Sequence, residues 1–263
     1  MRTLLNRPWL GLVFYVLTGL VHADMVNSPG AIDSIEAPPG LSFVYQAEMD
    51  LLQFAQEGKS QITVSVLPSG ESKALLALLL QSLGAAQYAS QIQDERVSGY
   101  PAATLRVQAQ TSDRITVLSG RDLSLVFRVQ DSENAARFDP WVEQAAKSLQ
   151  LAPAQLPVEM VGSFQTSSQY SGADYGGVSG YWQSSVYLGA QGEVVYGGYS
   201  SFSGPGSSVL GGGGAPQGVW QVRGNRLIVF SPPGDFLNAR FQVFRNGIEV
   251  YPAGGKTLLW VRQ

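Results

Sequence analysis

The sequence contains no cysteine and only one histidine, His22. Thiolate and imidazole are the groups that disulfide frameworks, Ser-His-Asp and Cys-His catalytic sites and most zinc or copper sites require. His22 lies in an N-terminal segment that we expect to be removed, so the remaining chain would carry neither group. We therefore predict no disulfide, no catalytic triad, no resident metal and no other cofactor.

Basic residues are also scarce. Residues 1–23 contain Arg2 and Arg7 and no acid, so their removal reduces the 17 basic residues to 15 against 20 acidic ones, a net charge of about −5. A protein that binds nucleic acid normally has the opposite sign or a dense basic stripe. The composition therefore argues against nucleic acid as a partner.

The N-terminus has a short apolar run from Pro8 to Val21, preceded by two arginines. The run is shorter than the roughly 20 residues that a membrane-spanning helix needs. Val21-His22-Ala23 fits the small-residue cleavage rule of secretory signal peptides. We predict that residues 1–23 are a signal peptide, that the protein is exported to the periplasm or the cell exterior, and that no stable membrane span remains after cleavage. The alternative is a segment that is retained as an anchor.

Residues 24–40 are rich in proline and glycine and have no periodic pattern, which predicts an irregular lead-in. Apolar and polar residues then alternate over residues 41–51 and 62–66, as expected for half-buried strands. A wide apolar face over residues 71–83, followed by Gly84, predicts a helix with a glycine cap.

Four short segments between residues 92 and 129 are predicted to form antiparallel strands connected by turns. Asp139 and Pro140 then predict the start of a second helix, because aspartate caps helices and proline suits the first helical position. This order of elements predicts an α+β domain over residues 41–152, with an antiparallel sheet and two helices on one face.

The order of elements, the turn Gly99-Tyr100-Pro101-Ala102 and the closing FDPWVEQAAKSL helix resemble the PsbP-like fold of many exported bacterial proteins. The resemblance covers roughly residues 41–152 and implies both the fold and the compartment. Members of this fold mostly act as accessory or assembly factors and share no catalytic motif. The resemblance therefore transfers no site residues.

A proline-punctuated linker, residues 153–157, is predicted to lead into a second domain over residues 158–263. The composition changes there, since residues 161–217 contain no lysine or arginine, only two acids and six of the eleven tyrosines. Within this domain, the glycine- and serine-rich residues 200–218 are predicted to form a long mobile loop.

Hairpin signals dominate the rest of this domain. Alternating segments flank residues 189–192, Gly224-Asn225 and Asn246-Gly247, which predicts a small all-β barrel or a curled antiparallel sheet with Trp260 in its core. The phrases G-x-W-x-V-x-G-N-x-L and L-x-W-x-R resemble those of the lipocalin-like calycin barrels at the C-termini of exported bacterial proteins. That resemblance implies a ligand cavity or a partner surface.

Pairs of carboxylates are the candidates for acid-base chemistry. Two such groups can hydrolyse a glycosidic bond when they flank it in space. Here they lie beside turns or on alternating strand faces, where a solvated charge is the default. The pairs are Glu48/Asp50, Asp94/Glu95 and Asp131/Glu133. We predict no enzyme and no catalytic residue, and retain a carboxylate-dependent glycan hydrolase as an alternative.

Aromatic residues in the nearly uncharged stretch are the candidate binding residues. A rigid amphipathic ring among small polar neighbours offers contact area at low entropic cost, although packing in the barrel core is the simpler interpretation. The candidates are Tyr170, Tyr175, Tyr181, Trp182, Tyr196 and Tyr199.

These residues lead to the main hypothesis, a non-catalytic exported protein whose C-terminal β domain binds a protein partner or an uncharged small molecule or glycan. The alternative is an envelope assembly or accessory factor that acts through its N-terminal domain.

Overall fold

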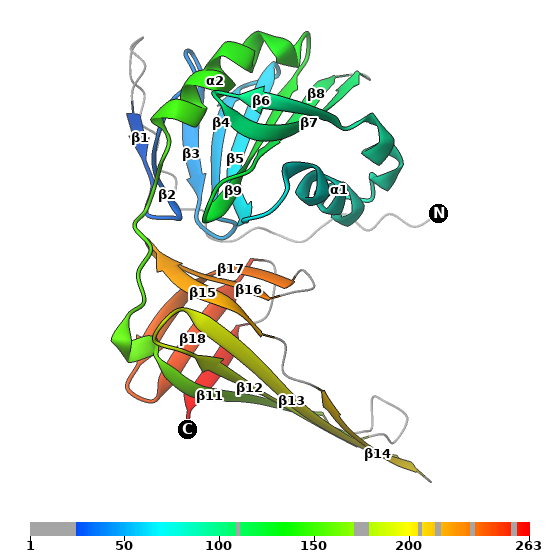
Figure 1. Cartoon of the computed structure of the whole chain (residues 1–263), viewed down its shortest axis with the longest axis vertical. Helices are drawn as coiled ribbons and strands as arrows, with labels where there is room; N and C mark the ends of the chain where they lie inside the picture. The colour runs from blue at the N-terminus through cyan, green and yellow to red at the C-terminus, as the bar shows by residue number, and fades with distance from the viewer. Residues whose placement is uncertain are drawn as a thin grey trace.

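The computed structural model describes residues 25–108, 111–170, 179–204, 207–213, 217–231, 235–253 and 257–263. The signal peptide predicted for residues 1–23 lies outside them. The described chain is mostly β, with three antiparallel sheets and few helices (Figure 1). We refer to residues 25–152 as the N-terminal half and to residues 153–263 as the C-terminal half.

The N-terminal half contains a seven-stranded sheet with the strand order β3-β4-β5-β9-β8-β7-β6. Alternation along its strands separates two faces; in β5, for example, Ile62 and Val64 are buried and Thr63 is half-buried. The strands are β3 Ser42–Gln46, β4 Leu51–Gln56, β5 Ser60–Pro68, β6 Gln93–Val97, β7 Tyr100–Gln108, β8 Ser112–Leu118 and β9 Leu123–Asp131.

Two α-helices pack on opposite faces of this sheet. Leu76 and Leu80 of α1 (Ser72–Ser82) cluster with Leu105, whereas Trp141 of α2 (Asp139–Ser148) lies edge-on against Phe127 on the other face. The expectation of two helices on one face is therefore wrong. The central strands are apolar on both sides, and each side requires its own cover. Three short 3-10 helices complete the helical content described: η1 Ala86–Gln91, η2 Ala135–Phe138 and η3 Val158–Met160.

The segment predicted to be an irregular lead-in contains two short strands. β1 (Met25–Asn27) pairs with β2 (Ile32–Glu36), and β2 pairs with β10 (Gln150–Leu151). Ile32 and Ile35 are buried in the cluster that contains Trp141. These strands are too short to show a period, and β2 has one of its partners far along the chain.

The C-terminal half forms a closed barrel (Figure 1). Its nine-stranded sheet has the order β12-β11-β19-β18-β17-β16-β15-β13-β14, and pairing of β12 with β13 closes all strands except β14 into a ring. The predicted barrel is thus confirmed. The strands are β11 Gly162–Tyr170, β12 Ser179–Leu188, β13 Glu193–Gly204, β14 Ser207–Gly213, β15 Gln217–Arg223, β16 Arg226–Ser231, β17 Asp235–Phe244, β18 Gly247–Pro252 and β19 Leu258–Arg262.

Side chains fill the barrel. Met160, Phe164, Trp220 and Trp260 are all buried in one cluster with aliphatic residues of the surrounding strands. Trp260 is 4% exposed, which confirms its predicted place in the core. The described side chains therefore form a packed core inside this part of the ring.

The segment predicted to be a mobile loop, residues 200–218, is largely strand. Residues 200–204 end β13, β14 follows, and β15 begins at Gln217. Ser200 pairs with Gly211 and Tyr199 with Gly212. Glycine weakens a strand because it has no side chain to pack, but it keeps its backbone hydrogen-bonding groups, and here cross-strand pairing overrides its low propensity. Residues 205–206 and 214–216 of the segment lie outside the described residues.

Candidate functional site

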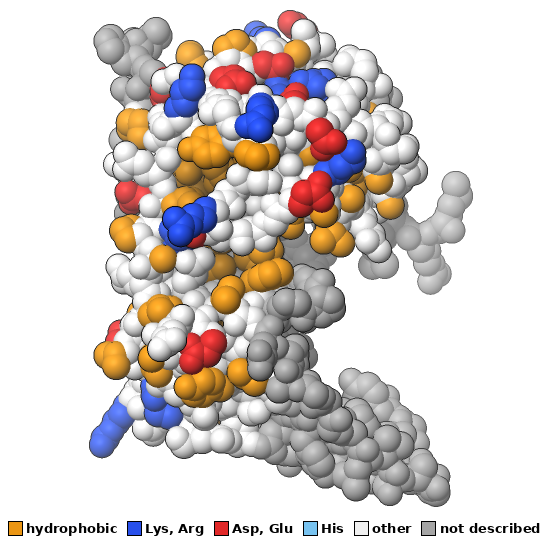
Figure 2. All heavy atoms as spheres, viewed as in Figure 1, with side chains coloured by type: hydrophobic (Ala, Val, Ile, Leu, Met, Phe, Trp, Pro, Cys, Tyr) orange, Lys and Arg blue, Asp and Glu red, His pale blue; other side chains and the backbone are white. Residues whose placement is uncertain are grey.

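The outer face of two barrel strands packs against the N-terminal half. Alternation along β16 places Leu227 and Val229 in the barrel core and leaves Arg226 and Ile228 on the outside, where Ile228 joins the core cluster of the N-terminal half. A cavity of about 430 Å³ beside this junction has walls from both halves. Figure 2 shows hydrophobic side chains gathered between the two halves.

Asp50 occupies the centre of a buried polar cluster at this junction. The strand expected over residues 41–51 is interrupted by a turn at residues 47–50, in which Asp50 has a left-handed φ of 52°. The Asp50 side chain accepts hydrogen bonds from the Tyr45 hydroxyl at 3.0 Å, the Ala31 amide at 3.2 Å and the Asn238 amide group at 2.9 Å. Burial, followed by the charge of Asp50, raises the pKa of Tyr45.

Arg226 lies opposite Asp50 and is completely buried. Its Nε donates to the Asn238 Oδ1 at 2.8 Å, its Nη1 to the Ala47 carbonyl at 2.8 Å and its Nη2 to the Asn238 carbonyl at 2.8 Å. Burial lowers the pKa of Arg226, and the charge of Asp50 opposes that effect. Because the polar groups of this cluster satisfy one another, we interpret it as the connection that fixes the barrel on the N-terminal half.

The structure separates the members of each carboxylate pair. Asp50 is buried, while Glu48 forms a surface ion pair with Arg240. Asp94 pairs with Lys73 at 3.0 Å on the α1 face of the sheet. Glu95, one residue further along the strand, lies on the opposite face and pairs with the buried Arg114 at 2.9 Å.

Asp131 has an internal structural role. It is 1% exposed and accepts hydrogen bonds from the Ser60 hydroxyl at 2.9 Å and from the backbone amides of Glu133 and Asn134 at 2.8 and 2.7 Å. Burial alone would raise the pKa of Asp131, but these bonds and the ion pair with Arg137 outweigh it and hold the pKa below the ordinary value. Glu133 is exposed, so neither side chain is arranged with the other around a substrate.

Five of the six aromatic candidates lie on β11, β12 and β13. Trp182 pairs with Ser168 and Ser200, and further along β12 the side chains of Val186 and Leu188 lie in the barrel core. Tyr196, which pairs with Val186, is half-buried against that core. Tyr170 pairs with Gly180 at the other end of β12.

Tyr181 and Tyr199 lie on neighbouring strands. Tyr181 pairs with Ser201 and Gln183 pairs with Tyr199, so the two tyrosines are two residues apart in register. Further along β12, Tyr187 is 41% exposed. Tyr175 lies outside the described residues.

The described residues show neither a metal cluster nor a membrane-spanning helix. Within them, no three His, Cys, Asp or Glu side chains come together as ligands. In the same part of the chain, no helix is both long enough and apolar enough to cross a bilayer.

No family model matches the chain, and no curated protein matches it. Among solved structures, it is similar to the cyanobacterial PsbP protein CyanoP from Synechocystis sp. PCC 6803, at 14% identity over 51% of this chain and 96% of that chain, with a TM-score of 0.34. It is also similar to a DUF3598 family protein of unknown function from Nostoc punctiforme PCC 73102, at 8% identity over 90% and 92% of the two chains, with a TM-score of 0.22. The sequence resembles the PsbP-like fold, and one of these solved structures is a PsbP protein.

Proposed function

We propose that this chain is a non-catalytic exported protein that binds a protein partner through the part of its sheet that grows out of the barrel. We call this part the sheet extension and define it as residues 166–170 of β11, 179–185 of β12, 197–204 of β13 and all of β14. Export is supported by the N-terminal sequence. The binding role is supported by the position, the composition and the free edge of the extension.

One observation carries the proposal, namely that β13 changes its neighbour. Residues 193–195 pair with β15 and close the barrel, whereas residues 198–204 pair with β14. The sheet therefore continues past the ring, and Figure 1 shows β12, β13 and β14 running away from the barrel. A filled barrel needs no such continuation for its own core.

The edge of the extension offers backbone hydrogen bonds. Among the described strands, β14 pairs with β13 alone. An unpaired strand edge is a template to which an extended segment of another protein can add. The strand consists only of Ser, Val, Leu and Gly, so it has none of the charged residues that commonly protect an edge.

The composition of the extension favours an uncharged partner surface. Residues 161–217 contain no basic residue and two acids, so long-range attraction to a charged partner is weak. Tyr181 and Tyr199 lie on paired strands among small polar residues, which is the composition of many adaptable recognition surfaces.

The test is the double variant Tyr181→Ala/Tyr199→Ala, with Tyr100→Ala as the matched control. Tyr100 is an exposed tyrosine in β7 of the N-terminal half. Each purified protein is crosslinked reversibly to native envelope fractions, and the captured proteins are quantified by mass spectrometry; glycan arrays are run in parallel.

We expect the double variant to lose at least nine-tenths of the captured partner and Tyr100→Ala to retain it. Unchanged capture by a folded double variant would show that the sheet extension does not bind the partner. Loss with Tyr100→Ala alone would instead support an accessory factor that acts through the N-terminal half.

A further inference from the structure

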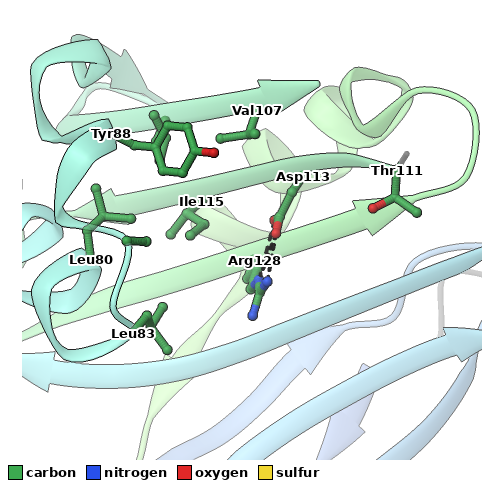
Figure 3. Close-up of a pocket in the computed structure, with 10 residues that line it drawn as sticks. Leu80, Leu83, Tyr88, Val107, Thr111, Asp113, Ile115 and Arg128 are labelled. Atoms are coloured by element: carbon green, nitrogen blue, oxygen red, sulfur yellow. Dashed lines mark hydrogen bonds and ion pairs between the residues drawn. The ribbon is translucent and has the colours of Figure 1, made fainter. Parts of the chain in front are cut away.

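The end of α1 leaves part of one sheet face open. The helix ends at Ser82, Gly84 follows with a φ of 69°, and the chain turns into η1. Leu76 and Leu80 pack on the row of Leu105 and Ile115. The next pair on the same face, Val107 and Asp113, lines a cavity of about 350 Å³ (Figure 3).

The cavity has an apolar wall and a polar end. Leu80, Leu83 and Ile115 form the apolar side, and Tyr88 of η1 extends over the cavity (Figure 3). Leu83 is 53% exposed, although its side chain is apolar. Asp113 and Arg128 lie together at the polar end.

The polar end is a neutral ion pair. Arg128 donates from Nη2 to the Asp113 Oδ2 at 2.7 Å and from Nε to both carboxylate oxygens at 3.2 and 3.3 Å. Gln130 donates to the same carboxylate at 3.3 Å. Among the described residues, Arg128 uses only Nε and Nη2 in these bonds, so Nη1 keeps its hydrogens for another acceptor.

We propose that this cavity binds a small uncharged amphiphile, with its alkyl or aryl body against the leucines and its amide or hydroxyl head against the Arg128–Asp113 pair. Its volume is at the lower end of the range of about 300–1,000 Å³ that is typical of ligand sites. The site belongs to the N-terminal half and does not depend on the sheet extension.

The ion pair selects against a charged head. Arg128 would attract a carboxylate head, but Asp113 would repel it. Asp113 would attract an ammonium head, but Arg128 would repel it. An uncharged amide avoids both repulsions because it accepts from Arg128 and donates to Asp113. The leucine wall favours an apolar body in all three cases.

The experiment is an NMR titration of the ¹⁵N-labelled protein with octanamide, octanoate and octylammonium, three probes with similar chains and different heads. The readout is the shift of the amides of η1 and β8. Val107→Phe fills the cavity, since Val107 is a lining residue in β7. Val158→Phe, at a position that is 82% exposed in η3, is the matched control.

We expect saturable binding of octanamide that is at least tenfold tighter than binding of either ion. Val107→Phe should weaken it at least tenfold and Val158→Phe should not. Asp113→Asn, which leaves Arg128 without its counter-charge, should reverse the order and favour octanoate. This variant tests the proposal even if Val107→Phe fails to fold.

Absence of a saturable shift at these amides would overturn the proposal. Equal binding of all three probes would also overturn it, because it would indicate unspecific apolar partitioning. If Asp113→Asn still preferred octanamide over octanoate, the ion pair would not determine which head group binds.

Discussion

Arg226 lies fully buried between the barrel and the N-terminal half, with its Nε 3.8 Å from Oδ2 of Asp50. Asn238 bridges the two, since its Nδ2 donates to Asp50 and its Oδ1 accepts from Arg226. A buried ion pair adds little net stability because both charges lose their hydration, but it penalises any arrangement that leaves one charge alone. The pair therefore specifies how the two halves dock.

The first prediction concerns this pair. Asp50→Asn should lower the free energy of unfolding by about 3 kcal/mol or more, because it leaves the Arg226 charge buried without its counterpart. Glu48→Gln is the control in the same turn; its pair with Arg240 is exposed, and such pairs contribute about 0–1 kcal/mol. Urea denaturation measures both. Equal small losses would mean that the buried pair does not hold the halves.

Gly224 gives a second prediction about the same junction. Its φ is 55°, and a Cβ at this position would lie 2.4 Å from the carbonyl oxygens of Pro29 and Gly30. Gly40 has a φ of 75°, and no described atom lies within 4 Å of its Cβ position. Alanine in a left-handed conformation costs roughly 1–2 kcal/mol at both sites, but only Gly224→Ala also pushes the halves apart.

We expect Gly224→Ala to lower the free energy of unfolding by about 1–3 kcal/mol more than Gly40→Ala does, which is the usual cost of overpacking. Urea denaturation measures both. Equal costs for the two variants would show that the junction yields without penalty and that the close approach of Gly224 to Pro29 is unimportant.

Asp131 predicts acid sensitivity. The pKa of its carboxyl is lower in the folded chain than the ordinary value of 3.8, so the unfolded chain binds the proton more readily. The stability that Asp131 contributes is therefore complete above the unfolded pKa and is lost as the pH falls through the folded pKa. Asp131→Asn should be less stable than the wild type at pH 7, and its stability should change less with pH below about 5.

Thermal unfolding between pH 2.5 and pH 7 checks this, with Glu133→Gln as the exposed control. The control should follow the wild-type profile. If Asp131→Asn lost as much stability as the wild type when the pH falls, the hydrogen bonds from Ser60 and from the two backbone amides would not be the source of the acid sensitivity.

Trp260 tests the barrel core. Trp260→Ala should cost about 3–5 kcal/mol because the ring is buried among the other core side chains. Leu259→Ala, one residue away on the outer face and 52% exposed, should change stability by less than about 1 kcal/mol. Equilibrium denaturation followed by tryptophan fluorescence and by circular dichroism compares the two. A small loss of stability in Trp260→Ala would mean that the ring contributes little to the packing of the core.

The barrel was predictable from the sequence because its hairpins carry local signals. Gly224-Asn225 forms the expected two-residue connection between paired Arg223 and Arg226. The second connection is displaced by one residue, since Phe244 pairs with Gly247 and the turn residues are Arg245 and Asn246. Local turn chemistry thus specifies hairpins well and their register less well.

The junction was not predictable, because its partners come from distant segments. Apolar alternation continues through residues 47–51, and only the left-handed Asp50 shows that the strand stops there. A solvated carboxylate is the usual outcome for such a residue, but here Asp50 is buried among Tyr45 and the distant residues Arg226 and Asn238. The pairing of the strands that carry the aromatic residues likewise depends on a register that composition does not reveal.

The most direct test of the central claim places a photoreactive phenylalanine analogue at position 199 in the sheet extension and, separately, at position 100 in the N-terminal half. Each protein is expressed in its native host and irradiated, and the adducts are analysed by mass spectrometry. The account predicts a reproducible protein adduct from position 199 that is absent at position 100. An adduct from position 100 alone, with none from position 199, would contradict it.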